Sequence, residues 1–127
     1  MNVVDSSAWL EYFANGANAK HFAGAIERTG ELIVPSVTLY EVFKKVLKDA
    51  DEERALQAVA AMQQGTVVDL DGQIALLAAR IGVERKLPMA DSIILATALV
   101  HGAVVWTQDA DFEGLPNVQY RPKERRR

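Results

Sequence analysis

Short apolar runs alternate along the chain with longer stretches in which apolar residues recur every three or four positions. The runs are short and rich in Val and Ile, so they predict buried β-strands rather than helices. The predicted strands cover Val3 and Val4 and residues 32–34, 67–70 and 104–106, with a short edge strand at 118–120. The stretches between them predict α-helices that begin near Ser6 or Ser7, Ala17, Ser36, Asp51, Asp71 and Met89. Ser6 or Ser7 is expected to cap the first of these helices.

This alternation of strands and helices predicts the fold class. All-apolar strands separated by helices are typical of a parallel sheet that is covered on both faces. The chain has 127 residues, half of them hydrophobic, which suits one such domain. The helix that begins near Ser36 carries its apolar stripe at Leu39, Val42, Phe43, Val46 and Leu47. Ligands of such sheets bind beyond the carboxyl ends of the strands, so residues that follow strands are the first functional candidates.

Four acidic residues interrupt or cap segments that would otherwise belong to the core. Asp5 ends the first apolar run, and Asp109 follows the apolar run at residues 103–108. Glu41 lies inside an apolar helical stretch, and Asp91 opens another. Burying an ionised carboxylate without a partner is expensive. Four such placements therefore predict one shared pocket that holds a hard cation, because such cations prefer oxygen ligands.

Each of these acids also has an ordinary structural interpretation. Asp5 is suited to cap the helix that follows it, and Asp91 is suited to complement the dipole of its own helix. Glu41 alone would fit a solvated helix position, although its apolar neighbours leave little room for an exposed face. Asp109 and Asp111 alone would fit loop acids. The hypothesis of a metal site rests on the joint pattern.

The composition narrows the chemistry further. There is no cysteine, which removes disulfides, thiolate catalysis and zinc–cysteine sites, and only two histidines are present. The absence of cysteine suits a reducing cytoplasm. Neither a signal-peptide pattern nor a run of the roughly 20 apolar residues that a membrane span needs is visible. We therefore expect a cytoplasmic protein with no membrane partner.

Charge is segregated along the chain. The net charge is -3, whereas residues 121–127 hold five basic residues and one acidic residue and so carry +4, which leaves -7 for the other 120 residues. We therefore expect one folded domain at residues 1–120 and a basic, flexible tail at residues 121–127. The tail either aids solubility alone or contacts the phosphates of an anionic partner such as a nucleic acid.

Four segments together carry a family resemblance. They are residues 4–8 (VDSSA), 35–42 (PSVTLYEV), 87–98 (LPMADSIILATA) and 105–112 (VWTQDADF). None of these motifs is specific alone, but all four in this order are fairly specific. The chain resembles the PIN-domain ribonucleases, and among them the VapC-type toxins of type II toxin–antitoxin pairs.

The resemblance implies a small three-layer α/β/α sandwich with a short, mostly parallel sheet. It implies an endoribonuclease that depends on Mg²⁺ or Mn²⁺ and hydrolyses RNA with a metal-activated water. The implied partners are the RNA substrate, a VapB-like antitoxin that covers the site, and a second copy of the chain in a homodimer. The site residues that it implies are Asp5, Glu41, Asp91 and Asp109 as catalytic and metal-binding acids, Asp111 as a further metal ligand, and Ser6 and Thr107 as supporting hydroxyls.

Other functions compete with a toxin nuclease. One is a PIN-like RNA-processing nuclease outside a toxin–antitoxin pair, and another is a PIN-like module that binds RNA or protein without cleaving. The second leaves the four acids unexplained, since two carboxylates ~4 Å apart repel by about 4 kcal/mol at an effective dielectric of 20. A phosphatase of the haloacid-dehalogenase type needs a second Asp two residues after the first, where this chain has Ser7.

Overall fold

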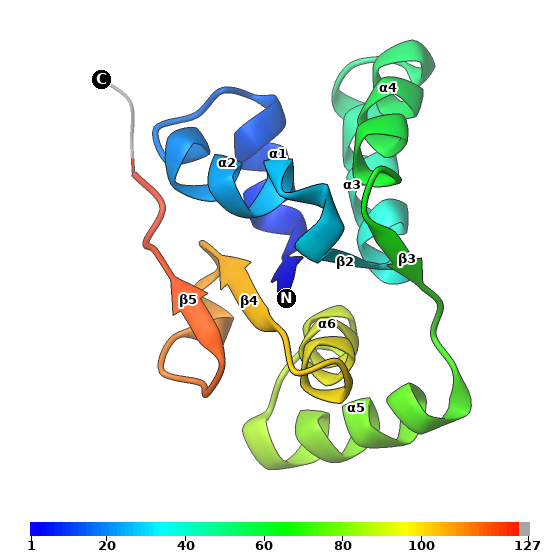
Figure 1. The fold of residues 1–127 in the computed structure, drawn as a ribbon, viewed down its shortest axis with the longest axis vertical. Helices are drawn as coiled ribbons and strands as arrows, with labels where there is room; N and C mark the ends of the chain where they lie inside the picture. Colours follow the sequence, from blue (N-terminus) through cyan, green and yellow to red (C-terminus); the bar gives the residue numbers. More distant parts are fainter. Residues whose placement is uncertain (125–127) are drawn as a thin grey trace.

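Five parallel strands form a single sheet in the computed structural model, which describes residues 1–124 (Figure 1). The strand order is β3-β2-β1-β4-β5, and each pairing of neighbours is parallel. The strands are β1 (Asn2–Val4), β2 (Leu32–Pro35), β3 (Thr66–Val68), β4 (Val104–Thr107) and β5 (Val118–Tyr120). The predicted parallel sheet is confirmed, including the short edge strand at its end.

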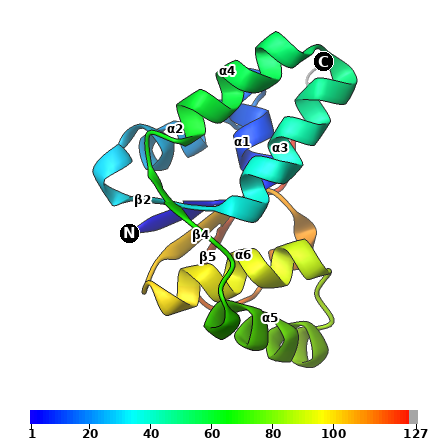
Figure 2. The same ribbon diagram turned by 90° about the vertical axis from the view of Figure 1, so that its right-hand side faces the viewer.

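Helices cover both faces of this sheet. Helices α1 to α4 lie on one face, whereas α5 and α6 lie on the other (Figure 2). The helices are α1 (Ser6–Phe13), α2 (Ala19–Glu27), α3 (Ser36–Asp49), α4 (Glu52–Met62), α5 (Gly72–Arg85) and α6 (Met89–Val100), with short 3₁₀ turns at Thr29–Glu31 and Ala110–Phe112. The arrangement is the expected three-layer α/β/α sandwich.

The handedness of the connections explains which helices lie on which face. Strands β1, β2 and β3 follow one another toward one edge of the sheet, and the chain then returns to place β4 on the other side of β1. Crossovers between parallel strands are almost always right-handed. Reversing the direction of travel therefore moves the crossover helices, here α5 and α6, to the opposite face. The reversal makes the gap between β1 and β4 the switch point of the sheet, where ligands of such folds bind.

Successive residues of the central strand β1 pack into two separate hydrophobic cores, one on each face of the sheet. Val3 packs with Val105 and the helix pair α5–α6, whereas Val4 packs with Trp9 and the helices of the other face. Both valines are fully buried. Side chains alternate between faces along a strand, so a strand covered on both sides reads as a continuous apolar run. This is the physical reason why the strand positions could be read from the sequence.

Three local expectations were wrong. The cap of α1 is Asp5, whose carboxylate accepts a hydrogen bond from the backbone N–H of Ser7; neither Ser6 nor Ser7 is the cap. Leu47 is 45% exposed, because the last turns of α3 pack against α4 and leave this side open to solvent. The third strand is Thr66–Val68 rather than residues 67–70, and it is an edge strand with exposed positions because it pairs only with β2.

Within residues 1–124, no helix has the length and apolar character needed to cross a membrane.

Candidate metal centre

Asp5 lies at the carboxyl end of the central strand and is 2% exposed. Its Oδ2 accepts hydrogen bonds from Ser7 Oγ at 2.7 Å and from Thr107 Oγ1 at 2.8 Å. Burial raises the pKa of the Asp5 carboxyl, while the hydrogen bonds from Ser7 and Thr107 act in the opposite direction. Asp5 thus caps α1, as its structural interpretation predicts, and it also places a carboxylate at the switch point of the sheet.

Glu41 enters the same region from α3, which begins directly after β2. It is half-buried, and its Oε1 accepts a hydrogen bond from Ser6 Oγ at 2.6 Å. Ser6 is the first residue of α1 and Glu41 lies in the second turn of α3, so this contact joins two helices that follow neighbouring strands. The hydroxyl of Ser6 therefore orients the carboxylate of Glu41, as a supporting residue would.

Asp91 is a second carboxyl of this region whose pKa is raised. It lies in the first turn of α6 and is 8% exposed. Burial is the largest cause that raises its pKa, to about 8, and the negative charges of Asp5, Asp109, Asp111 and Glu41 add to the rise in that order. Four acids that come from three other parts of the sequence are therefore close enough to act on the carboxyl of Asp91.

Asp109 and Asp111 come from the loop that follows β4. The backbone N–H of Asp109 donates to Thr107 Oγ1 at 2.9 Å, and Asp109 Oδ1 accepts from the backbone N–H of Asp111 at 2.9 Å. Carboxylate oxygens of Asp91, Asp109 and Asp111 all lie within 4.8 Å of one another. Since Thr107 also donates to Asp5, its single hydroxyl links the loop acids to the central strand.

The donor set fits a hard divalent cation. It consists of carboxylates, which Mg²⁺ and similar ions take as ligands, and it contains no cysteine or histidine. No ion pair between these five acids and a Lys or Arg side chain occurs within residues 1–124. Their mutual repulsion must therefore be relieved by a proton, as the raised pKa of Asp91 indicates, or by a cation.

Two features of the site escaped the sequence analysis. The sequence suggests only a helix cap for Ser7, yet its hydroxyl donates to Asp5 and lies 3.4 Å from Thr107 Oγ1. Asn18 is 1% exposed, and its Nδ2 donates to Gln108 Oε1 at 3.1 Å. No sequence signal marks Asn18, because its contact with the residue before Asp109 joins positions 90 apart.

A cleft of about 860 Å³ opens beside this centre. Ser7 and Asp109 line one part of it, and the remaining walls come from α1, the α3–α4 hairpin and the segment after β5. The centre is therefore accessible to a large ligand on this side.

Comparisons with known proteins agree with the geometry. The sequence matches the PIN-domain family over residues 3–117. It is 30% identical over 125 residues to Ribonuclease VapC4 of Mycobacterium tuberculosis (strain ATCC 25618 / H37Rv), and the match covers 92% of each chain.

Solved structures with the same fold include VapC-type proteins. A toxin–antitoxin complex from Klebsiella pneumoniae contains a chain with a TM-score of 0.79 and 25% identity, over 94% of this chain and 96% of that one. The sarcin–ricin-loop-cleaving toxin VapC20 of Mycobacterium tuberculosis has a TM-score of 0.76 and 18% identity, over 91% of this chain and 95% of that one. With its acids at the switch point of a parallel sheet, the chain belongs to the PIN-domain family and, within it, to the VapC-type ribonucleases.

Proposed function

We propose that this protein is an endoribonuclease that requires Mg²⁺ or Mn²⁺, and that it acts in the cytoplasm as the toxin of a toxin–antitoxin pair. The observation that carries the proposal is the convergence of four acids on a fifth carboxyl, that of Asp91, at the switch point of the sheet. A fold with no catalytic task gains nothing from such a cluster, because each like-charged neighbour opposes ionisation.

Asp91, Asp109 and Asp111 are the residues that would hold the cation, together with Asp5 and Glu41 from the neighbouring strand and helix. When bound, the cation lowers the pKa of a water molecule and offsets negative charge on the phosphate oxygens. The protein supplies fixed carboxylates, because Ser7 and Thr107 hold Asp5. It also supplies burial, which strengthens every electrostatic contact in the centre.

The supporting hydroxyls have a positioning role in this proposal. Ser6 fixes one oxygen of Glu41, and Thr107 connects Asp5 to the backbone of Asp109. Removing a partner of this kind typically lowers metal affinity or activity by roughly tenfold to a hundredfold. They touch the acids rather than the RNA.

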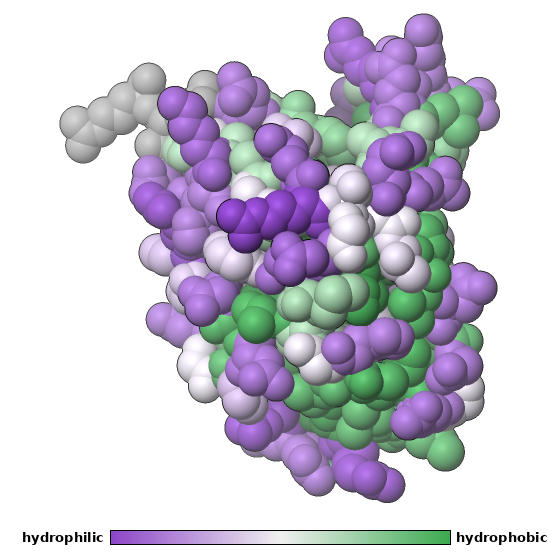
Figure 3. Space-filling view, in the orientation of Figure 1, coloured by the Kyte–Doolittle hydropathy of each residue, from purple (hydrophilic) through white to green (hydrophobic). Residues whose placement is uncertain are grey.

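Two protein partners belong to the same proposal. The Klebsiella pneumoniae relative is part of a toxin–antitoxin complex, which supports a VapB-like antitoxin that covers the acidic centre. A second copy of the chain is the proposed occupant of the apolar surface of α5 and α6, where Val83, Met89 and Leu76 are 81%, 78% and 72% exposed. Figure 3 shows hydrophobic residues gathered over the lower part of the molecule, where Figure 1 places α5.

Cleavage of a labelled single-stranded RNA tests the nuclease proposal. We expect cleavage with Mg²⁺ or Mn²⁺, none with EDTA, and none with Asp109→Asn. Asp69→Asn is the matched control, because Asp69 is an exposed acid outside the cluster. Cleavage that continues in EDTA, or equal rates for the two variants, would reject the metal-centre assignment. Suppression of cleavage by the product of a small neighbouring reading frame would support the toxin role.

A further inference from the structure

The cleft beside the acidic centre is lined by cationic side chains from two distant parts of the sequence. Lys45 and Arg54 line it from the α3–α4 hairpin, and Lys123 lines it from the segment that follows β5. The same cleft includes Asp109, so a ligand that fills it also reaches the proposed metal centre. A polyanion is the ligand that such cations attract.

Arg54 and Lys123 are the more available of these cations. Lys45 Nζ is 3.0 Å from Asp49 and is therefore paired on its own helix. Arg54 Nε is 3.9 Å from Asp51, with 72% of the arginine side chain exposed, and an exposed pair of this kind contributes little. Lys123 has no carboxylate within ion-pair distance among residues 1–124.

The segment that carries Lys123 is fixed to the body of the protein. The backbone N–H of Arg121 donates to Thr107 O at 3.0 Å, which continues the pairing of β4 with β5. The side chain of Asn18 donates to Pro122 O at 3.0 Å and also to Gln108 Oε1. From β5 the chain runs beside the beginning of α2 (Figure 1), and Asn18 is the N-cap residue of that helix. Lys123 is therefore placed in the cleft by a clamp that also holds the loop of Asp109.

The apolar wall of the cleft suits unpaired bases. Phe13, Leu10 and Val46 line it, and the ring of Phe13 is half-buried and stacked on Trp9 with centroids 5.6 Å apart. Proteins that bind single-stranded nucleic acid combine cations along the backbone path with aromatic surface for the bases. A protein with net charge -3 and a cluster of acids at its centre needs such local cations to hold RNA at all.

We propose that this cleft binds the single-stranded RNA substrate, and that Arg54 and Lys123 contact its phosphates as the strand passes the acidic centre. The inference deepens the proposed nuclease function and rests on it. The inference also assigns a role to one residue of the basic tail, Lys123, which acts from a fixed position. Arg125, Arg126 and Arg127 lie outside the described residues.

Kinetics with single substitutions test the cleft. Arg54→Ala and Lys123→Ala should each raise KM for an unstructured RNA by roughly threefold to tenfold and leave kcat nearly unchanged. Each should also flatten the slope of log(kcat/KM) against log salt by about 0.7, the contribution of one phosphate on a single strand. Arg80→Ala is the control, because Arg80 is an exposed arginine of α5 that does not line the cleft.

A binding measurement separates this inference from the nuclease proposal. Fluorescence anisotropy of a labelled RNA oligonucleotide in EDTA should show weaker binding by both cleft variants than by Arg80→Ala, whether or not the wild-type protein cleaves. If the wild-type protein does not cleave RNA, the nuclease proposal fails, but the anisotropy measurement still shows whether the cleft binds RNA. RNA affinity, KM and salt slope equal to those of Arg80→Ala would overturn the inference. The same would follow if the variants weakened only antitoxin binding, since the cleft would then belong to a protein partner.

Discussion

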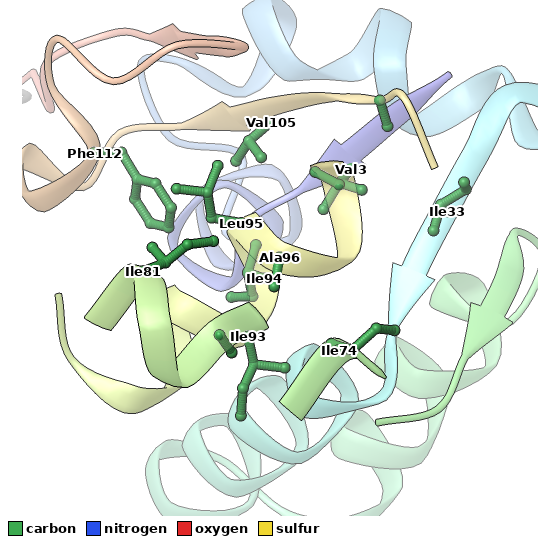
Figure 4. Close-up of a cluster of buried hydrophobic side chains, with 13 residues drawn as sticks. Val3, Ile33, Ile74, Ile81, Ile93, Ile94, Leu95, Ala96, Val105 and Phe112 are labelled. Carbon is green, nitrogen blue, oxygen red and sulfur yellow. The ribbon is translucent and has the colours of Figure 1, made fainter. Parts of the chain in front are cut away.

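Helix α6 takes part in two regions of opposite character. Its residues Ile93, Ile94, Leu95 and Ala96 pack between the sheet and α5 in an apolar cluster (Figure 4). In the first turn of the same helix, Asp91 is buried among four other acids. The first region stabilises the fold, because burial of apolar surface is favourable. The second destabilises the metal-free fold, because it crowds like charges in a buried place.

The contrast teaches how a small domain keeps an unfavourable site. The apolar positions fix the helix so firmly that Asp91 cannot move away from its neighbours, and fixed carboxylates are what a metal centre requires. If this account holds, substitutions in the two regions should have opposite effects on stability and on activity.

Asp91→Asn should have the largest effect on activity. It removes a carboxylate from the centre, so RNA cleavage should fall by at least about a hundredfold. The variant should nevertheless remain folded, because Ile93, Ile94 and Leu95 still pack. Circular dichroism and a cleavage assay measure both effects. A folded variant that cleaves at the wild-type rate would show that Asp91 has no catalytic role.

The same variant should be more stable than the wild type without metal, and increasingly so as pH rises. The pKa of Asp91 is about 8 in the folded protein and 3.8 for an ordinary Asp. Between these values the unfolded chain binds fewer protons than the folded one, so wild-type stability falls with rising pH and levels off above about 8.

Thermal unfolding in EDTA from pH 5 to pH 9 measures this pH dependence. The melting temperature of Asp91→Asn should exceed that of the wild type by on the order of 5–10 °C at pH 8, and by less at pH 5. A difference that does not change with pH would mean that Asp91 is ionised throughout this range and that its burial costs nothing.

Ile94→Ala tests the apolar region of α6 and should lower stability rather than activity. Ile94 is fully buried in the cluster beneath the sheet. Its truncation should lower the free energy of unfolding by about 2–5 kcal/mol and leave cleavage per folded molecule unchanged. Urea titration measures the first quantity, with Leu56→Ala as the control, because Leu56 is 54% exposed on α4. Equal losses in the two variants would show that this cluster is not the main source of stability.

Thr107→Val should have the smallest effect, confined to the centre. The substitution keeps the shape of the side chain but removes the hydroxyl that joins Asp5 to the backbone of Asp109. Metal affinity should fall by roughly tenfold. Thr97→Val is the matched control, since Thr97 is also buried, and its hydroxyl donates only to Ile93 O within α6. If calorimetric titration gives both variants the wild-type metal affinity, Thr107 does not position the centre.

Much of the fold was predictable because its signals are local. Buried parallel strands read as apolar runs, and Asp71 marks the start of α5 through a cap that the structure confirms. The errors arose where tertiary contacts decide. Leu47 continues the apolar stripe of α3, but its exposure depends on where α4 lies, and the extent of β3 depends on its single neighbour β2.

The candidate site was predictable for a different reason. Acids at strand ends and helix starts must meet when parallel strands share one edge, and the structure brings Asp5, Glu41, Asp91, Asp109 and Asp111 together. Their metal-binding and catalytic roles stay predictions. The clamp formed by Asn18 was not predictable, because it depends on contacts with positions 90 and 104 residues away.

The central claim is that the acidic cluster is a divalent-cation site. Calorimetric titration of Mg²⁺ or Mn²⁺ into wild-type protein and into Asp5→Asn tests it directly, since Asn is also a good helix cap and should preserve α1. We expect saturable binding to the wild type and markedly weaker binding to the variant. Metal at a hundred times its dissociation constant should also stabilise the wild type by about 2.7 kcal/mol. No binding to the wild type, or equal binding to both proteins, would contradict the account.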